Sequence, residues 1–150
     1  MSDIKLGDFL CSRERAEYAT GSVTSMNERL EQISVAADGT LYGDADIIAR
    51  IGATPELKPF FAPGSRAEVP VAGTIFNRFV SRRIDRMMGD DANKTVWILD
   101  YKTDIDPTVM REKYVSQIRE YVNLMQHIYP TYTVNGYILW THDWRVEKII

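Results

Sequence analysis

Two aspartates and a lysine, Asp85, Asp100 and Lys102, are the residues whose types and spacing best suit chemistry. Asp100 and Lys102 stand two positions apart directly after the apolar run 96–99, so in a strand their side chains point to the same face. Charged groups at the end of a buried strand are costly unless they are paired, bound to a metal or solvated in a cleft. A second carboxylate alongside, from Asp85, would repel the first unless a cation lay between them. Hard oxygen ligands of this kind suit Mg²⁺.

Gln117 and Tyr121 extend this candidate site. They are four residues apart, so they share one face of a helix, next to an apolar stripe at positions 114, 118, 121, 125 and 128. A glutamine beside such a stripe normally needs a partner inside the fold. A metal-bound water, the lysine or a phosphate of DNA could be that partner, whereas Tyr121 could equally be a core residue whose hydroxyl is satisfied.

The elements that must position these residues are predicted from periodicity and turn chemistry. Residues 68–71 lead into a strand, 77–88 form a long strand, 89–93 form a turn, and 96–99 form a strand buried on both faces. A helix follows, with Asp106 as its cap and Pro107 at its first position, and Pro130 closes it. Residues 133–140 and 144–150 read as two further strands, which gives the order β-β-β-α-β-β.

The first 65 residues are predicted to be a helical leader. Helices are expected at 26–33 and at 44–51, the second ended by Gly52, and a further turn is expected to start at Thr54 and Pro55. Residues 62–65 are a clear break. We therefore expect a single α/β domain over 1–150, with 66–150 as its catalytic core.

Composition narrows the class of protein. No apolar run approaches the length that spans a bilayer, and the single cysteine, Cys11, cannot form an internal disulfide, so a cytoplasmic protein is expected. The net charge of −3 is unusual for a nucleic-acid binder, whose affinity depends on phosphate contacts. Either the basic residues are concentrated on one face, or another protein segment supplies affinity for DNA.

The ordered set of motifs resembles a nuclease family. Asp85 followed after 14 residues by Asp100-Tyr-Lys102 is similar to the PD-(D/E)xK nuclease motif, and Gln117-x-x-x-Tyr121 narrows the likeness to the RecB-type branch. Over roughly residues 55 to 150 the chain most resembles the C-terminal nuclease domain of AddA-type helicase–nucleases. The resemblance implies a restriction-endonuclease-like core, a mixed β-sheet flanked by helices.

The resemblance also implies roles for individual residues. Asp85 and Asp100 would ligate Mg²⁺ or Mn²⁺, and Lys102 would position the attacking water and stabilise charge on the phosphate. Glu68 would be a supporting acid, and Gln117 and Tyr121 would line the site. Arg82 and Arg86 are candidate contacts to DNA phosphates, because strand alternation places both on one face; a solvated strand is the other interpretation.

The wider function implied is that of an exonuclease domain in an ATP-dependent helicase–nuclease that repairs double-strand breaks by recombination. An AddB-type subunit would be its partner, and single-stranded DNA its substrate. The chain has no Gly-x-x-x-x-Gly-Lys-Ser/Thr loop, so it is expected to be a piece of a longer protein whose motor binds ATP.

Two departures from the family pattern keep a second hypothesis open. Arg82 stands where family members usually have glycine, and residues 1–67 contain no histidine that could act as the upstream metal ligand of RecB-type sites. An inactive nuclease-fold module that binds DNA or a partner is therefore one alternative, with Asp100 and Lys102 as a structural ion pair, and a free-standing nuclease of the same superfamily is another.

Overall fold

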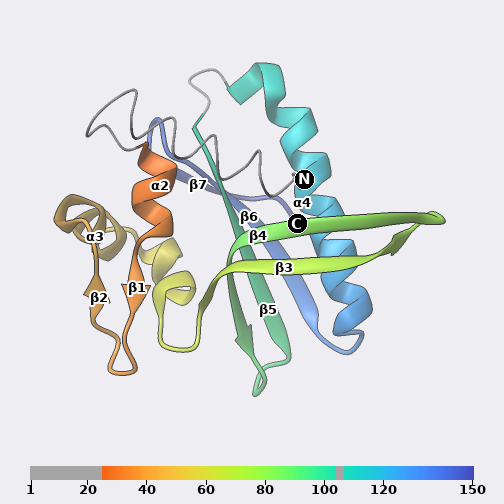
Figure 1. The fold of residues 1–150 in the computed structure, drawn as a ribbon, viewed down its shortest axis with the longest axis horizontal. Coiled ribbons are helices and arrows are strands. Elements are labelled where there is room, and N and C mark those ends of the chain that lie inside the picture. Colours follow the sequence, from red (N-terminus) through yellow and green to blue (C-terminus); the bar gives the residue numbers. More distant parts are fainter. Residues whose placement is uncertain (1–24, 104–106) are drawn as a thin grey trace, which may run out of the picture.

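The computed structural model describes residues 25–103 and 107–150, and its centre is a five-stranded mixed sheet (Figure 1). The strand order is β3-β4-β5-β6-β7; β5 and β6 are parallel, and the other neighbours are antiparallel. The elements are β3 (Arg66–Ile75), β4 (Arg78–Asp90), β5 (Thr95–Lys102), α4 (Pro107–Ile128), β6 (Thr133–Trp140) and β7 (Arg145–Lys148). The predicted order β-β-β-α-β-β and the mixed sheet are confirmed. The proposed cap Asp106 lies outside the described residues.

The apolar run at 96–99 places β5 in the middle of the sheet, as predicted for a strand covered on both faces. Val96 and Ile98 pack into a core cluster that includes α4, whereas Leu99 and Tyr101 pack into a second cluster on the opposite face. Since side chains alternate along a strand, Asp100 and Lys102 follow Ile98 toward the α4 face. β5 thus places Asp100 and Lys102 at the edge of the layer packed between the sheet and α4.

Helix α4 crosses from β5 to β6 and covers one face of the sheet, as a parallel pair of strands requires (Figure 1). Ile118, Tyr121 and Met125 of the predicted stripe are buried, but Ile128 at the helix end is exposed, which contradicts the prediction for that residue. Gly136 of β6 allows the close approach, because a Cβ atom there would lie 2.4 Å from Cγ2 of Ile118.

The described part of the leader covers the other face of the sheet. Its elements are α2 (Met26–Glu31), β1 (Ser34–Val35), β2 (Leu41–Tyr42), α3 (Ala45–Gly52) and the 3₁₀ helix η1 (Pro55–Phe61). Leu30, Ile47, Leu57 and Phe60 are buried in one cluster with Leu99 and its neighbours. The predicted helices are present, and the short β1–β2 hairpin is an addition to a leader that was expected to be helical; residues 1–24 of the leader lie outside the described part. None of the helices in the described ranges has the length and apolar character needed to cross a membrane.

Candidate active site

The candidate site forms where β4 and β5 part. The antiparallel ladder between them ends at the pair Arg86–Leu99, one step before Asp85 would stand opposite Asp100. In place of a backbone carbonyl, Oδ2 of Asp85 accepts the N–H of Tyr101 at 2.8 Å. The carboxylate of Asp85 therefore satisfies a backbone N–H of β5 where the two strands diverge, and it lies beside the carboxyl group of Asp100.

The side-chain alternation of β4 changes at the same point. Ile84 and Met87 are three residues apart, yet both pack in the cluster on the α4 face, so the alternation of β4 is interrupted between them. The pairing with β3 keeps the same register on both sides of the interruption, and only the opposite residues Glu68 and Asp85 are left out of the ladder. Beyond this interruption, the guanidinium of Arg86 lies on the face opposite α4, against η1.

Arg86 is consequently a structural residue, and the prediction that it shares a face with Arg82 is wrong. Its side chain is 3 % exposed; Nε donates to the carbonyl of Phe60 at 2.7 Å, and Nη2 donates to Oγ of Ser65 at 3.2 Å. The guanidinium also lies 4.5 Å from the ring centre of Phe61. Burial lowers the Arg86 pKa. A guanidinium held in this way is not placed to contact a phosphate.

The two aspartates strongly perturb each other. Burial raises the pKa of Asp85 to about 9, and the charge of Asp100 and a hydrogen bond with its carboxyl group contribute to the rise, while the Tyr101 N–H opposes it. Asp100 itself is 4 % exposed. At neutral pH and without a cation, the pair therefore holds a proton that an exposed aspartate would have released.

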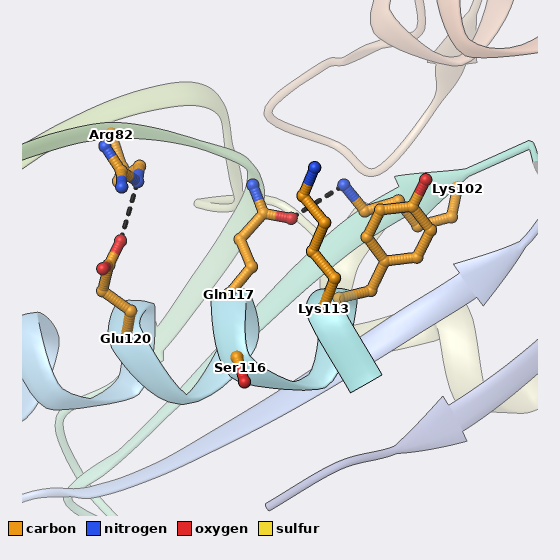
Figure 2. Close-up of a pocket in the computed structure, with 7 residues that line it drawn as sticks. Arg82, Lys102, Lys113, Ser116, Gln117 and Glu120 are labelled. Atoms are coloured by element: carbon orange, nitrogen blue, oxygen red, sulfur yellow. Dashed lines mark hydrogen bonds and ion pairs between the residues drawn. The ribbon is translucent and has the colours of Figure 1, made fainter. Parts of the chain in front are cut away.

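Lys102 connects this acidic pair to helix α4. Its Nζ lies 2.8 Å from Oδ2 of Asp100, donates to Oε1 of Gln117 at 2.8 Å, and sits 4.3 Å from the ring centre of Tyr114 (Figure 2). Gln117 in turn donates from Nε2 to the hydroxyl of Tyr121 at 2.9 Å. Of the partners considered for Gln117, the structure supplies the lysine.

Tyr121 ends this row of polar contacts inside the core. Burial raises the pKa of its hydroxyl, and the negative charges of Asp100 and Asp85 raise it further, so the phenol stays protonated. The structure thus brings together five of the six residues that the sequence singled out as catalytic: Asp85, Asp100, Lys102, Gln117 and Tyr121.

One oxygen of Asp100 makes the site suitable for a divalent cation. Oδ2 is buried and has no hydrogen bond, because Lys102 approaches it at ion-pair distance without hydrogen-bond geometry. A buried carboxylate oxygen with a free lone pair, next to a second carboxyl group, fits a hard cation. Within the described ranges, no group of three or more His, Cys, Asp or Glu residues is assembled. Two carboxylates would leave most of the coordination to water and phosphate, which is the usual arrangement for Mg²⁺.

A groove of about 490 Å³ opens beside the site between β4 and α4. Its lining residues are Arg82, Lys102, Lys113, Tyr114, Ser116, Gln117 and Glu120 (Figure 2). Nε of Arg82 pairs with Glu120 across the groove at 2.7 Å. Lys113 was not singled out from the sequence, although its position one helical turn before Gln117 placed it on the same face.

Glu68 has a different position from the one the resemblance implied. It stands across from Asp85 on β3, but its backbone is left-handed with φ of 52°, and the ladder has no pair there. Its carboxylate lies 3.0 Å from Nη1 of Arg83. The structure directs Glu68 to that arginine and not to Lys102.

Glu31 at the end of α2 is an acidic neighbour that sequence reasoning missed. Its negative charge adds to the effects that raise the pKa of Asp85, although it is the smallest of the contributions named. Helix α2 lies against β5 here, with Asn27 Nδ2 3.4 Å from the carbonyl of Tyr101. Nothing in the local sequence of α2 indicates this proximity, since Glu31 and Asp85 are far apart along the chain and the fold alone brings them together.

Comparisons with known proteins add no assignment. No protein-family model matches the chain, and no curated protein matches it in sequence.

Proposed function

We propose that this chain is a metal-dependent deoxyribonuclease domain with a restriction-endonuclease-like core of the RecB type. The observation that carries the proposal is the meeting of Asp85 and Asp100 at the divergence of two strands, with Lys102 2.8 Å from the second carboxylate. Carboxylates that repel one another, one of them with an unsatisfied buried oxygen, are the arrangement that a divalent cation relieves.

The side chains then divide the work of phosphodiester hydrolysis. Asp85 and Asp100 would hold Mg²⁺ or Mn²⁺, which supplies a Lewis acid and lowers the pKa of bound water. Lys102 places a positive charge where negative charge develops on the phosphate, and Gln117 keeps that ammonium in position. Tyr121 fixes the other end of Gln117 and, as a protonated phenol, adds no charge of its own.

The wider setting rests on the sequence resemblance. The domain would act as the exonuclease of an ATP-dependent helicase–nuclease in recombinational repair of double-strand breaks. A motor elsewhere in the longer protein and an AddB-type subunit would feed single-stranded DNA to the site, in the cytoplasm. The acidic net charge is compatible with this arrangement, because the rest of the machine would contribute to DNA affinity.

The test is cleavage of linear single-stranded DNA with and without Mg²⁺ or Mn²⁺. The wild type should cut only with metal, and Asp100→Asn and Lys102→Ala should each lower the rate by at least about 100-fold. Asp46→Asn and Lys58→Ala are matched controls on exposed positions of α3 and η1 and should cut like the wild type. Undiminished cutting by both site variants would remove the assignment of this site.

A non-catalytic DNA-binding module is the second candidate. It is favoured by the contacts of Lys102, which already pairs with Asp100 and Gln117, and by the absence of a third acidic or imidazole ligand among the described residues. Binding of DNA without cutting, together with no heat of Mg²⁺ or Mn²⁺ binding in calorimetry, would support it over the nuclease.

A further inference from the structure

The hairpin of β3 and β4 projects from the body of the protein as an arm, defined here as residues 66–83 (Figure 1). One face of the arm lies on α4: Val80 is buried in the core cluster there, and Arg82 pairs with Glu120. The tip is the two-residue turn Phe76-Asn77, in which both residues have positive φ, 51° and 62°. This is the hairpin geometry that follows the strand twist.

The other face of the arm is exposed and leads to the acidic pair. Phe79, Ser81 and Arg83 point away from α4, because they alternate with Val80 and Arg82, and Asp85, where this alternation is interrupted, follows two residues after Arg83. The residues of β3 that pair with the row are small and exposed: Thr74, Ala72 and Pro70. Six residues of strand, about 20 Å, separate Phe79 from Asp85 at the candidate site.

Charge separates the arm from the rest of the protein. Its residues include four arginines and one glutamate, a net charge of +3, whereas the whole chain carries −3. Arg78 and Arg82 pair with Glu120 of α4, and Arg83 pairs with Glu68 of the arm, so it is the excess positive charge of the arm as a whole that would attract a polyanion.

Two aromatic side chains of the arm are exposed to solvent. Phe76 is 93 % exposed and Phe79 is 72 % exposed. Phe76 also occupies a left-handed backbone conformation, which is unfavourable for a bulky residue and would suit glycine or asparagine better. Exposed aromatic side chains on a segment with excess positive charge are a surface on which unpaired bases can stack.

We propose that the outer face of the arm binds single-stranded DNA, with bases stacked on Phe79 and Phe76, and guides the strand to Asp85 and Asp100. This inference rests on the proposed function for the identity of the polymer, and it adds a binding surface outside the site. At a spacing of about 3.4 Å between stacked nucleotides, about six nucleotides would lie between Phe79 and the acidic pair.

Binding measured without cleavage tests the arm separately from the nuclease. A fluorescein-labelled oligothymidylate is titrated with protein in EDTA, and its anisotropy is recorded. Phe79→Ala should weaken binding about tenfold and Phe76→Ala/Phe79→Ala further, whereas Phe79→Trp should bind at least as well as the wild type. Tyr42→Ala is the matched control: it removes a 58 % exposed aromatic from β2, outside the arm, and should bind like the wild type. Unchanged unfolding midpoints establish that the variants are folded.

The outcomes separate the two proposals. The proposal that the arm binds single-stranded DNA is overturned if Phe79→Ala binds within about twofold of the wild type, or if Tyr42→Ala loses as much affinity as Phe79→Ala. This holds even if the wild type cuts DNA with Mg²⁺. If Phe79→Ala loses binding and the wild type does not cut DNA, the result supports DNA binding by the arm and contradicts the proposed nuclease activity. A wild type that does not bind the oligothymidylate overturns the proposal that the arm binds single-stranded DNA.

Discussion

Replacing Asp85 by asparagine should stabilise the protein, and increasingly so as the pH rises. The ordinary pKa of this carboxyl is 3.8, and in the folded protein it is about 9. Between these values the unfolded chain has lost a proton that the folded protein retains, so the wild type loses stability as the pH rises. The asparagine introduced at this position would still accept the N–H of Tyr101 through its carbonyl oxygen and would donate to Asp100 through its amide.

The size of the effect follows from the pKa. From pH 5 to pH 8, three pH units at about 1.4 kcal/mol each give an upper bound of about 4 kcal/mol. Access of water to the cleft reduces this, and we expect the free energy of unfolding of Asp85→Asn to gain about 2 kcal/mol on the wild type over that interval. Saturating Mg²⁺ should stabilise the wild type and leave the variant almost unchanged.

The assay is urea unfolding in EDTA at pH 5 and pH 8, followed by tryptophan fluorescence. Asp38→Asn is the control: hydrogen bonds from Thr40 lower the pKa of Asp38, so this group stays ionised in both states and the gap to the wild type should not change with pH. An Asp85→Asn variant that is destabilised equally at both pH values would refute the reasoning. It would mean that Asp85 is ionised like an exposed carboxylate and serves only as the acceptor for Tyr101.

Two further predictions concern the fold. Arg86→Met should lower the free energy of unfolding by about 2 to 4 kcal/mol, because the buried carbonyl of Phe60 loses its donor. Arg50→Met, on the surface of α3, is the control and should change it by less than about 1 kcal/mol. Urea unfolding measures both variants, and equal effects would contradict the structural role of Arg86. Gly136→Ala should lower the free energy of unfolding by about 1 to 3 kcal/mol, because the new Cβ would overlap Ile118. A variant as stable as the wild type would show that α4 is free to shift.

Much of the architecture could be predicted because its signals are local. The apolar run at 96–99 is continuous, the helical stripe from Tyr114 to Met125 is long and periodic, and both elements are present where expected. The strands at Ser34–Val35 and Leu41–Tyr42 are only two residues long, too short for any period to be visible. In the same segment, the helix α3, which has a clear cap at Asp44, was correctly predicted.

The candidate site could be predicted where chain order and period determine the geometry. Asp100 and Lys102 share a face because they are two residues apart on a strand, and Gln117 reaches the lysine because it lies on the helix that follows. Arg86 was misplaced because the alternation on which the prediction relied is interrupted between Ile84 and Met87. Glu31 could not be found, since its proximity depends on how the leader packs against β5.

The anchoring of Arg86 has a consequence for how short an autonomous version of this protein can be. Its guanidinium binds the carbonyl of Phe60 and the hydroxyl of Ser65, and it is the immediate neighbour of Asp85. A truncation that began at Arg66 would leave that cation without its acceptors and would uncover Leu99, Tyr101 and Leu139. The segment from Ser25 to Ser65 is thus an integral part of the α/β core, and a minimal fragment must include it.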